Sequence, residues 1–154
     1  MKALTTAEID ALLGSNNYTK KYFAGTYPAC VVPTTKRQKF AFISNTDEHQ
    51  NPGTHWNAFA VNGKTLTFFD SFGRSPWDAS FPIFFEKYAS QFDIVRFVKL
   101  RVQGLESNSC GFFCIHFVYM MALDFDIKRF LEDYSSDYKM NDVTVRNFVS
   151  STFK

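Results

Sequence analysis

Apolar and polar positions near the start of the chain predict one helix and one strand. Thr5 followed by Glu8 has the spacing of a capping box, and Gly14 is a suitable residue to end a helix. These signals predict a short helix over residues 6–13. Residues 38–44 carry the apolar and aromatic side chains typical of a strand.

The middle of the chain has the pattern of a β-hairpin. Residues 55–61 and 64–70 are two runs rich in β-branched and aromatic side chains, separated by Asn62-Gly63. That dipeptide is the strongest short signal for a two-residue hairpin loop. We therefore expect two antiparallel strands joined by a turn at Asn62-Gly63.

The remaining segments predict mainly helices. In chain order we expect a turn over 49–54, a loop over 71–81, a helix over 82–90 opened by Pro82, a strand over 93–102, a buried helix over 110–123 that is apolar on all sides, and one or two short surface helices in the tail, one starting near Asn141. This order predicts an α+β fold with a central, mostly antiparallel sheet flanked by helices. The 154 residues fit one domain, 1–154, that can bury a substantial core.

Composition narrows the class of protein. Apolar residues make up 45% of the chain, and its 19 phenylalanines indicate a dense aromatic core. A net charge of +2 is too balanced to indicate nucleic-acid binding by itself. Three cysteines do not suggest a secreted disulfide framework, so we expect reduced thiols and an intracellular or virion setting. The start lacks the apolar segment of a signal peptide, and no apolar run is long enough to span a bilayer.

The predicted hairpin brings His55 and Asp70 together. With a two-residue loop at Asn62-Gly63, these two residues are directly opposite each other at the open end of the hairpin. A carboxylate there can orient an imidazole and stabilise its protonated form. The alternative is an ordinary polar pair across two strand ends.

Cys110 favours the catalytic interpretation of that pair. It begins the predicted buried helix and follows the cap-competent residues Ser107-Asn108-Ser109. A helix N-terminus favours a thiolate through its dipole and free amides. The alternative is a buried structural cysteine, which is how we interpret Cys114, one turn deeper in the helix.

The other cysteines and histidines receive no catalytic role. Cys110, Cys114 and His116 do not have the spacing of a zinc site, so no metal is expected. We interpret His116 as a core or helix-face histidine and His49 as a solvated turn residue, and we assign Cys30 no role.

Several segments resemble the adenovirus protease (adenain) family of cysteine proteases. They are YFAGTYPACVVP, KFAFISNT, GTHWNAFAV, FFDSFG and QGLESNSCGFFC. The order His-Trp, Asp, then Gln-Gly with Cys-Gly seven residues after the Gln also marks the related ubiquitin-like-protein-specific proteases. The resemblance covers about residues 1–125.

The resemblance implies a role for each matching residue. Cys110 matches the nucleophile, His55 the general base and Asp70 the acidic residue that orients the base. Gln103 matches the glutamine of the oxyanion hole. Trp56 matches the tryptophan that shapes a narrow substrate groove.

The same resemblance bears on cofactors and partners. Adenain is activated by DNA and by a peptide joined through a disulfide, but the stretch Phe92 to Val102 has no cysteine for such a link. We expect no required cofactor and do not expect peptide activation by that route. Lys36, Arg37 and Lys39 form a small basic patch, which leaves weak DNA binding open beside the simpler interpretation of a solvated face.

Two enzymatic functions and one binding function fit these patterns. The first is a thiol endopeptidase of viral or mobile-element type, a monomer that cleaves viral precursor polypeptides near glycine to mature virion proteins. The alternative is an isopeptidase that removes ubiquitin-like modifiers. A degenerate fold that only binds partners is disfavoured, because all four catalytic positions hold competent residues.

Overall fold

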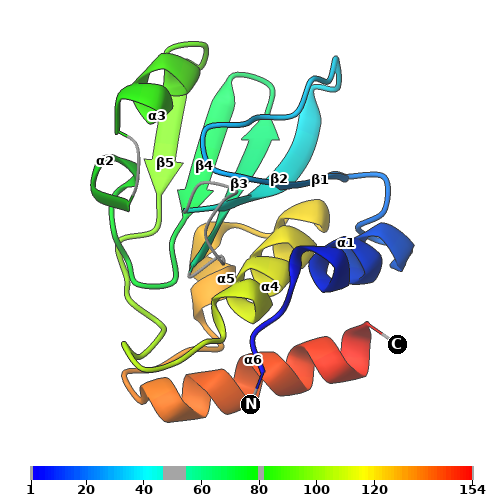
Figure 1. Ribbon diagram of the computed structural model, residues 1–154, viewed down its shortest axis with the longest axis vertical. Coiled ribbons are helices and arrows are strands. Elements are labelled where there is room, and N and C mark those ends of the chain that lie inside the picture. Colours follow the sequence, from blue (N-terminus) through cyan, green and yellow to red (C-terminus); the bar gives the residue numbers. More distant parts are fainter. Residues whose placement is uncertain (1, 47–54, 80–81, 154) are drawn as a thin grey trace.

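A five-stranded sheet lies between helices in the computed structural model, which describes residues 2–46, 55–79 and 82–153 (Figure 1). In chain order the elements are α1 (Thr6–Ser15), β1 (Phe23–Tyr27), β2 (Lys39–Asn45), β3 (Trp56–Asn62), β4 (Thr65–Phe69), α2 (Pro76–Ala79), α3 (Pro82–Ala89), β5 (Ile94–Phe97), α4 (Cys110–Ala122), α5 (Ile127–Leu131) and α6 (Tyr138–Thr152). The predicted turn over 49–54, with His49, lies outside the described residues.

The sheet confirms the predicted α+β class. Its strands run in the order β1-β2-β3-β4-β5, and β2, β3 and β4 are antiparallel, as expected. Both outer strands are instead parallel to their neighbours, so the sheet is mixed. The parallel pairing of β5 with β4 follows from the crossover through α2 and α3, which returns the chain to the end where β4 began.

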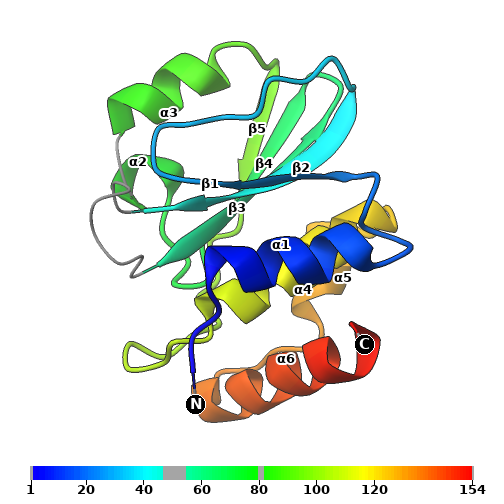
Figure 2. The ribbon, with the colours of Figure 1, turned by 45° about the vertical axis from the view of Figure 1, so that its right-hand side comes forward.

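Apolar side chains cover both faces of the sheet because neighbouring strand residues point to opposite sides. Ala58 and Ala60 of β3 pack with α1, α4, α5 and α6 on one face. Phe59 and Val61 of the same strand pack with α3 on the other face. Figure 2 shows α4 next to the sheet and α6 on the far side of α4. Helix α4, which begins at Cys110, is therefore buried, as predicted.

The hairpin register differs from the prediction by two residues. Asn62 pairs with Thr65, so the turn is Gly63-Lys64 and not Asn62-Gly63. Gly63 has a φ of +60°, which glycine adopts without strain at the first position of such a turn. Asn62 stays in the ladder because the neighbouring strand β2 extends this far: Lys39 pairs with Asn62 and the N–H of Gly63 donates to the carbonyl of Gln38 at 2.7 Å.

Several predicted boundaries also need correction. Helix α1 has the predicted capping box but continues through Gly14 to Ser15. The predicted strand over 93–102 pairs only at Ile94–Phe97, because the chain then leaves the ladder to bond with the loop after β4. Strand β1 was missed because all five of its residues are half-buried, so no alternation of buried and exposed positions marks it. The short helix α2 was missed within the predicted loop.

The tail forms a longer helix than expected. Helix α6 has 15 residues and begins at Tyr138, three residues before the predicted start. Asp137 caps it by accepting a hydrogen bond from the N–H of Met140 at 3.1 Å. Among the described residues, no helix is long and apolar enough to cross a membrane.

Candidate active site

His55 and Asp70 meet at the open end of the β3–β4 hairpin. His55 immediately precedes β3 and Asp70 immediately follows β4, and His55 Nε2 lies 2.9 Å from Asp70 Oδ1. They are diagonal neighbours and not directly opposite, because the register is displaced by two residues. A displacement of two keeps both side chains on the same face, so the predicted contact forms although the predicted register is wrong.

The surroundings of Asp70 favour the ionised form of its carboxyl group. Its side chain is fully buried, and burial alone would raise its pKa. The hydrogen bond and charge of His55, the N–H of Phe72 at 2.8 Å and the guanidinium of Arg74 at 2.9 Å outweigh that cost and lower the pKa. Phe72 and Arg74 were not predicted from the sequence, although both follow Asp70 within four residues.

His55 lies between the carboxylate and the thiol. Its ring stacks on Phe72, with ring centroids 4.6 Å apart. Burial lowers the pKa of His55, but hydrogen bonds and charge interactions with Asp70 and Cys110 reverse this and raise the pKa to about 9. His55 is therefore an imidazolium at neutral pH, ready to donate a proton.

Cys110 is the first residue of α4 and completes the row of polar groups. It is 4% exposed, and its interaction with His55 helps to raise the pKa of that imidazole, whose Nε2 faces Asp70. A thiol, an imidazole and a carboxylate thus follow one another at the N-terminus of a buried helix. This is the nucleophile, base and orienter arrangement of covalent catalysis.

Gln103 lies in the loop before α4 and is anchored at both ends of its amide. Its Oε1 accepts a hydrogen bond from the hydroxyl of Ser71, and its Nε2 donates to the carbonyl of Ser107 at 2.9 Å. The backbone N–H of Gln103 also donates to the carbonyl of Ser71 at 3.0 Å. These contacts tie the loop before the nucleophile to the residue after Asp70. The oxyanion role of Gln103 stays a prediction.

Trp56 packs against the first turn of helix α4. It is buried in the same core as α4, and a Cβ atom added to Gly111 would lie 3.4 Å from Trp56 Cδ1. Gly111, the residue after Cys110, therefore lies next to Trp56, and an added Cβ would be in ordinary van der Waals contact with the indole. The predicted role of Trp56 in a substrate groove is not decided by this packing and stays a prediction.

The other thiols and the other described histidine lie outside this arrangement. Cys114 is fully buried, donates to the carbonyl of Trp56 at 3.3 Å, and has a pKa raised by burial. Burial also lowers the pKa of His116 to about 4, and its ring packs among aromatic side chains. Both are core residues, as predicted, whereas Cys30 is exposed. In the described part of the chain, no group of three His, Cys, Asp or Glu residues is placed to hold a metal ion.

Gly73 allows the segment after Asp70 and the segment before Gln103 to pack closely against each other. It has a φ of +75°, and a Cβ atom there would lie 2.8 Å from the backbone nitrogen of Arg101. We expect Gly73→Ala to lower the free energy of unfolding by about 1–3 kcal/mol, and to reduce activity by moving the Asp70 turn away from the Gln103 segment. Urea unfolding and peptide turnover measure the two effects. Gly14→Ala is the matched control, because Gly14 lies in helix α1 with nothing within 4 Å of an added Cβ; equal losses in both variants would contradict the prediction.

The pKa of His55 predicts how stability depends on pH. The folded protein binds this proton more tightly than the unfolded chain, whose histidine titrates near 6.5, since the folded pKa is about 9. The stabilisation by protonated His55 is therefore fully present below pH 6.5 and is lost as the pH rises through about 9. Urea unfolding across this range should show stability falling in the wild type and a flatter profile in His55→Gln. Parallel profiles for the two proteins would contradict the raised pKa.

Comparison with known proteins identifies the fold. No protein-family model and no curated protein sequence matches the chain. Among solved structures, a protease of ASFV, the African swine fever virus, is similar over 93% of this chain and 66% of its own, with a TM-score of 0.62 and 17% identity. A second crystal structure of that protease matches 74% of this chain and 44% of its own chain, with a TM-score of 0.49 and 20% identity. The SUMO protease Ulp1 matches 74% of this chain and 54% of its own chain, with a TM-score of 0.37 and 18% identity.

The chain therefore has a protease fold, in agreement with the resemblance of its sequence to a family of cysteine proteases. It spans 66% of the length of the viral protease chain it matches. Cys110, His55 and Asp70 add to this fold the side chains that a cysteine protease needs.

Proposed function

We propose that the protein is a cysteine endopeptidase with Cys110 as its nucleophile. The observation that carries the proposal is the position of His55, which bridges the buried carboxylate of Asp70 and the thiol of Cys110 at the start of α4. An ordinary polar pair at two strand ends would need neither the thiol nor the helix N-terminus.

The residues support a two-step acyl transfer. The Cys110 thiolate attacks the substrate carbonyl carbon while the Gln103 amide and the Cys110 backbone N–H hold the oxyanion. The imidazolium of His55 then gives its proton to the leaving amine, which breaks the peptide bond and leaves a thioester on Cys110. His55 next takes a proton from water, the hydroxide releases the acid, and the thiolate and imidazolium are restored.

The proposed substrates are viral precursor polypeptides cut near glycine during virion maturation. The fold shared with a viral protease supports this, together with the resemblance to adenain in the segments around His55 and Cys110. The proposal includes a monomer that acts inside the host cell and in the virion without a cofactor. DNA is a candidate activator only, since Arg37 and Lys39 of the basic patch already bond to Lys21 and Asp124.

Substrate preference follows from the groove proposed beside Trp56. A tight groove over the scissile bond admits residues without a bulky side chain, and glycine gives the closest backbone approach. We expect a strong demand for glycine one or two positions before the cut, with an aliphatic residue further upstream by resemblance to adenain. A glycine-containing peptide library, read by mass spectrometry, measures this preference. Equal turnover of matched peptides with leucine in place of glycine would contradict it.

A competition assay separates the endopeptidase from the isopeptidase. Short peptides need only the groove, whereas a modifier protease draws much of its binding energy from the folded partner. When short peptides and intact ubiquitin-like fusions are present together at equal concentrations, we expect the peptides to be cleaved efficiently. Efficient cleavage of the fusions with nearly inert peptides would favour the isopeptidase.

A further inference from the structure

The guanidinium of Arg146 on α6 joins three segments around the nucleophile. Its Nε donates to the hydroxyl of Ser109 at 2.9 Å, and one terminal nitrogen donates to Oδ1 of Asn108 at 2.8 Å. The other terminal nitrogen donates to the carbonyl of Lys2 at 3.3 Å, and the group lies over the Phe112 ring, 4.3 Å from its centroid. One side chain thus contacts both residues before Cys110, the first turn of α4 and the N-terminal segment.

The contact with Ser109 changes how α4 begins. Ser109 is the N-cap residue, and a serine there normally accepts a hydrogen bond from an amide of the first turn. Here its side chain makes no capping hydrogen bond to α4, a helix that the structure describes throughout, and its hydroxyl instead accepts from Arg146. The hydroxyl therefore does not compete for the first-turn amides beside the Cys110 sulfur.

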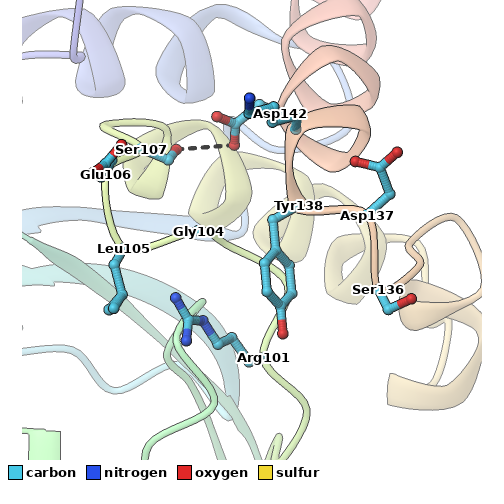
Figure 3. Close-up of a pocket in the computed structure, with 10 residues that line it drawn as sticks. Arg101, Gly104, Leu105, Glu106, Ser107, Ser136, Asp137, Tyr138 and Asp142 are labelled. Carbon is cyan, nitrogen blue, oxygen red and sulfur yellow. Dashed lines mark hydrogen bonds between the residues drawn. The ribbon is translucent and has the colours of Figure 1, made fainter.

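Asp142, one turn earlier on α6, holds the same loop from the same side. Its Oδ1 accepts a hydrogen bond from the hydroxyl of Ser107 at 2.9 Å (Figure 3). Ser107 in turn accepts from Gln103 Nε2 through its carbonyl and from the N–H of Ser109 through its hydroxyl, at 2.9 and 3.1 Å. Helix α6 is thereby connected to the nucleophile and to the predicted oxyanion glutamine.

We propose that Arg146 is a positioning residue for Cys110: it holds the Ser109 hydroxyl away from the first turn of α4 and fixes the loop that presents the thiol. The inference rests on the proposed function and extends the site to the C-terminal helix. Without the guanidinium, Ser109 is free to cap the helix and the loop loses two of its hydrogen bonds. The thiol then meets a substrate carbonyl less often in the reactive geometry.

Arg146→Met tests the proposal because methionine keeps the apolar contact with Phe112 and removes the hydrogen bonds. We expect kcat to fall about 10²-fold, with KM changed by less than about threefold, since a small misplacement of a reacting group can cost that much. The kcat of Arg146→Lys should lie between those of the wild type and Arg146→Met, because an ammonium cannot donate to Ser109 and Asn108 in the forked geometry of a guanidinium. Alkylation of Cys110 by iodoacetamide should slow about tenfold in Arg146→Met, as expected for a thiol that loses its activating environment.

Two controls separate positioning from a general loss of stability. Val145→Ala on the same helix removes buried core contacts and should lower Tm while leaving kcat and the alkylation rate near wild type. Arg146→Met combined with Ser109→Ala should lose no more kcat than Arg146→Met alone, because residues that act through each other are not additive. The proposal would be overturned if the losses of kcat were additive in the double variant. It would also be overturned if Val145→Ala lost as much kcat and alkylation rate as Arg146→Met.

The alkylation experiment also separates this inference from the proposed function. If the wild-type protein cleaves neither peptides nor fusions, the endopeptidase proposal fails, and the alkylation rates of wild type and Arg146→Met still decide the role of Arg146. Equal rates in folded proteins would then overturn the positioning role, and a slower rate in Arg146→Met would support it.

Discussion

Cys110→Ala is expected to abolish peptide hydrolysis while the protein stays folded. The substitution removes the thiol that interacts with His55, so no thioester can form. The side chain is at the start of α4 and is small, so the loss of packing is modest. Peptide turnover and thermal unfolding of the purified variant measure the two outcomes. Substantial turnover by Cys110→Ala would rule out the proposed mechanism.

Cys114→Ala is the matched control for that experiment. Cys114 is one turn deeper in the same helix, and its pKa is raised by burial, so it should contribute to stability and not to chemistry. In the wild type, iodoacetamide should label Cys110 faster than exposed Cys30 or buried Cys114 at neutral pH, because Cys110 has the His55 imidazolium and the N-terminus of α4 beside it.

Asp70→Asn is expected to lower kcat/KM by about 10²–10⁴-fold, since the same change in a serine–histidine–aspartate triad costs about 10⁴. The amide cannot supply the negative charge that keeps His55 protonated, and it can present a donor to the ring and so favour the wrong tautomer. The pKa of His55 should therefore fall, which nuclear magnetic resonance of the ring detects.

Arg74→Met serves as the control for Asp70→Asn. It removes one hydrogen bond to the carboxylate, but the side chain of Arg74 is 38% exposed, whereas the carboxylate itself is fully buried and stays hydrogen-bonded to His55. We expect a much smaller loss of activity than for Asp70→Asn. If both variants lost the same activity, the carboxylate would act through the loop after β4 and not through the imidazole.

The sequence by itself determined the local structure and the chemical types at the site. The capping box at Thr5, the apolar run that becomes α4 and the two halves of the hairpin are short-range signals, because their hydrogen bonds and periodicity involve near neighbours. The face shared by His55 and Asp70 was also predictable. Strand side chains alternate with a period of two, so an error of two residues in register leaves the face unchanged.

Contacts between distant segments were decided only by the tertiary structure. The turn moved to Gly63-Lys64 because β2 extends along β3, which no signal within the hairpin reveals. Likewise the anchoring of Gln103 by Ser71 joins residues 32 positions apart.

The contact of Ser109 with Arg146 spans 37 positions. Ser109 occupies the N-cap position that a serine before an apolar helix predicts, but its hydroxyl accepts a hydrogen bond from a guanidinium of the last helix and none from a first-turn amide. The residue types of the site are therefore encoded locally. Their orientation depends on long-range hydrogen bonds, which form only after the helices have packed on the sheet.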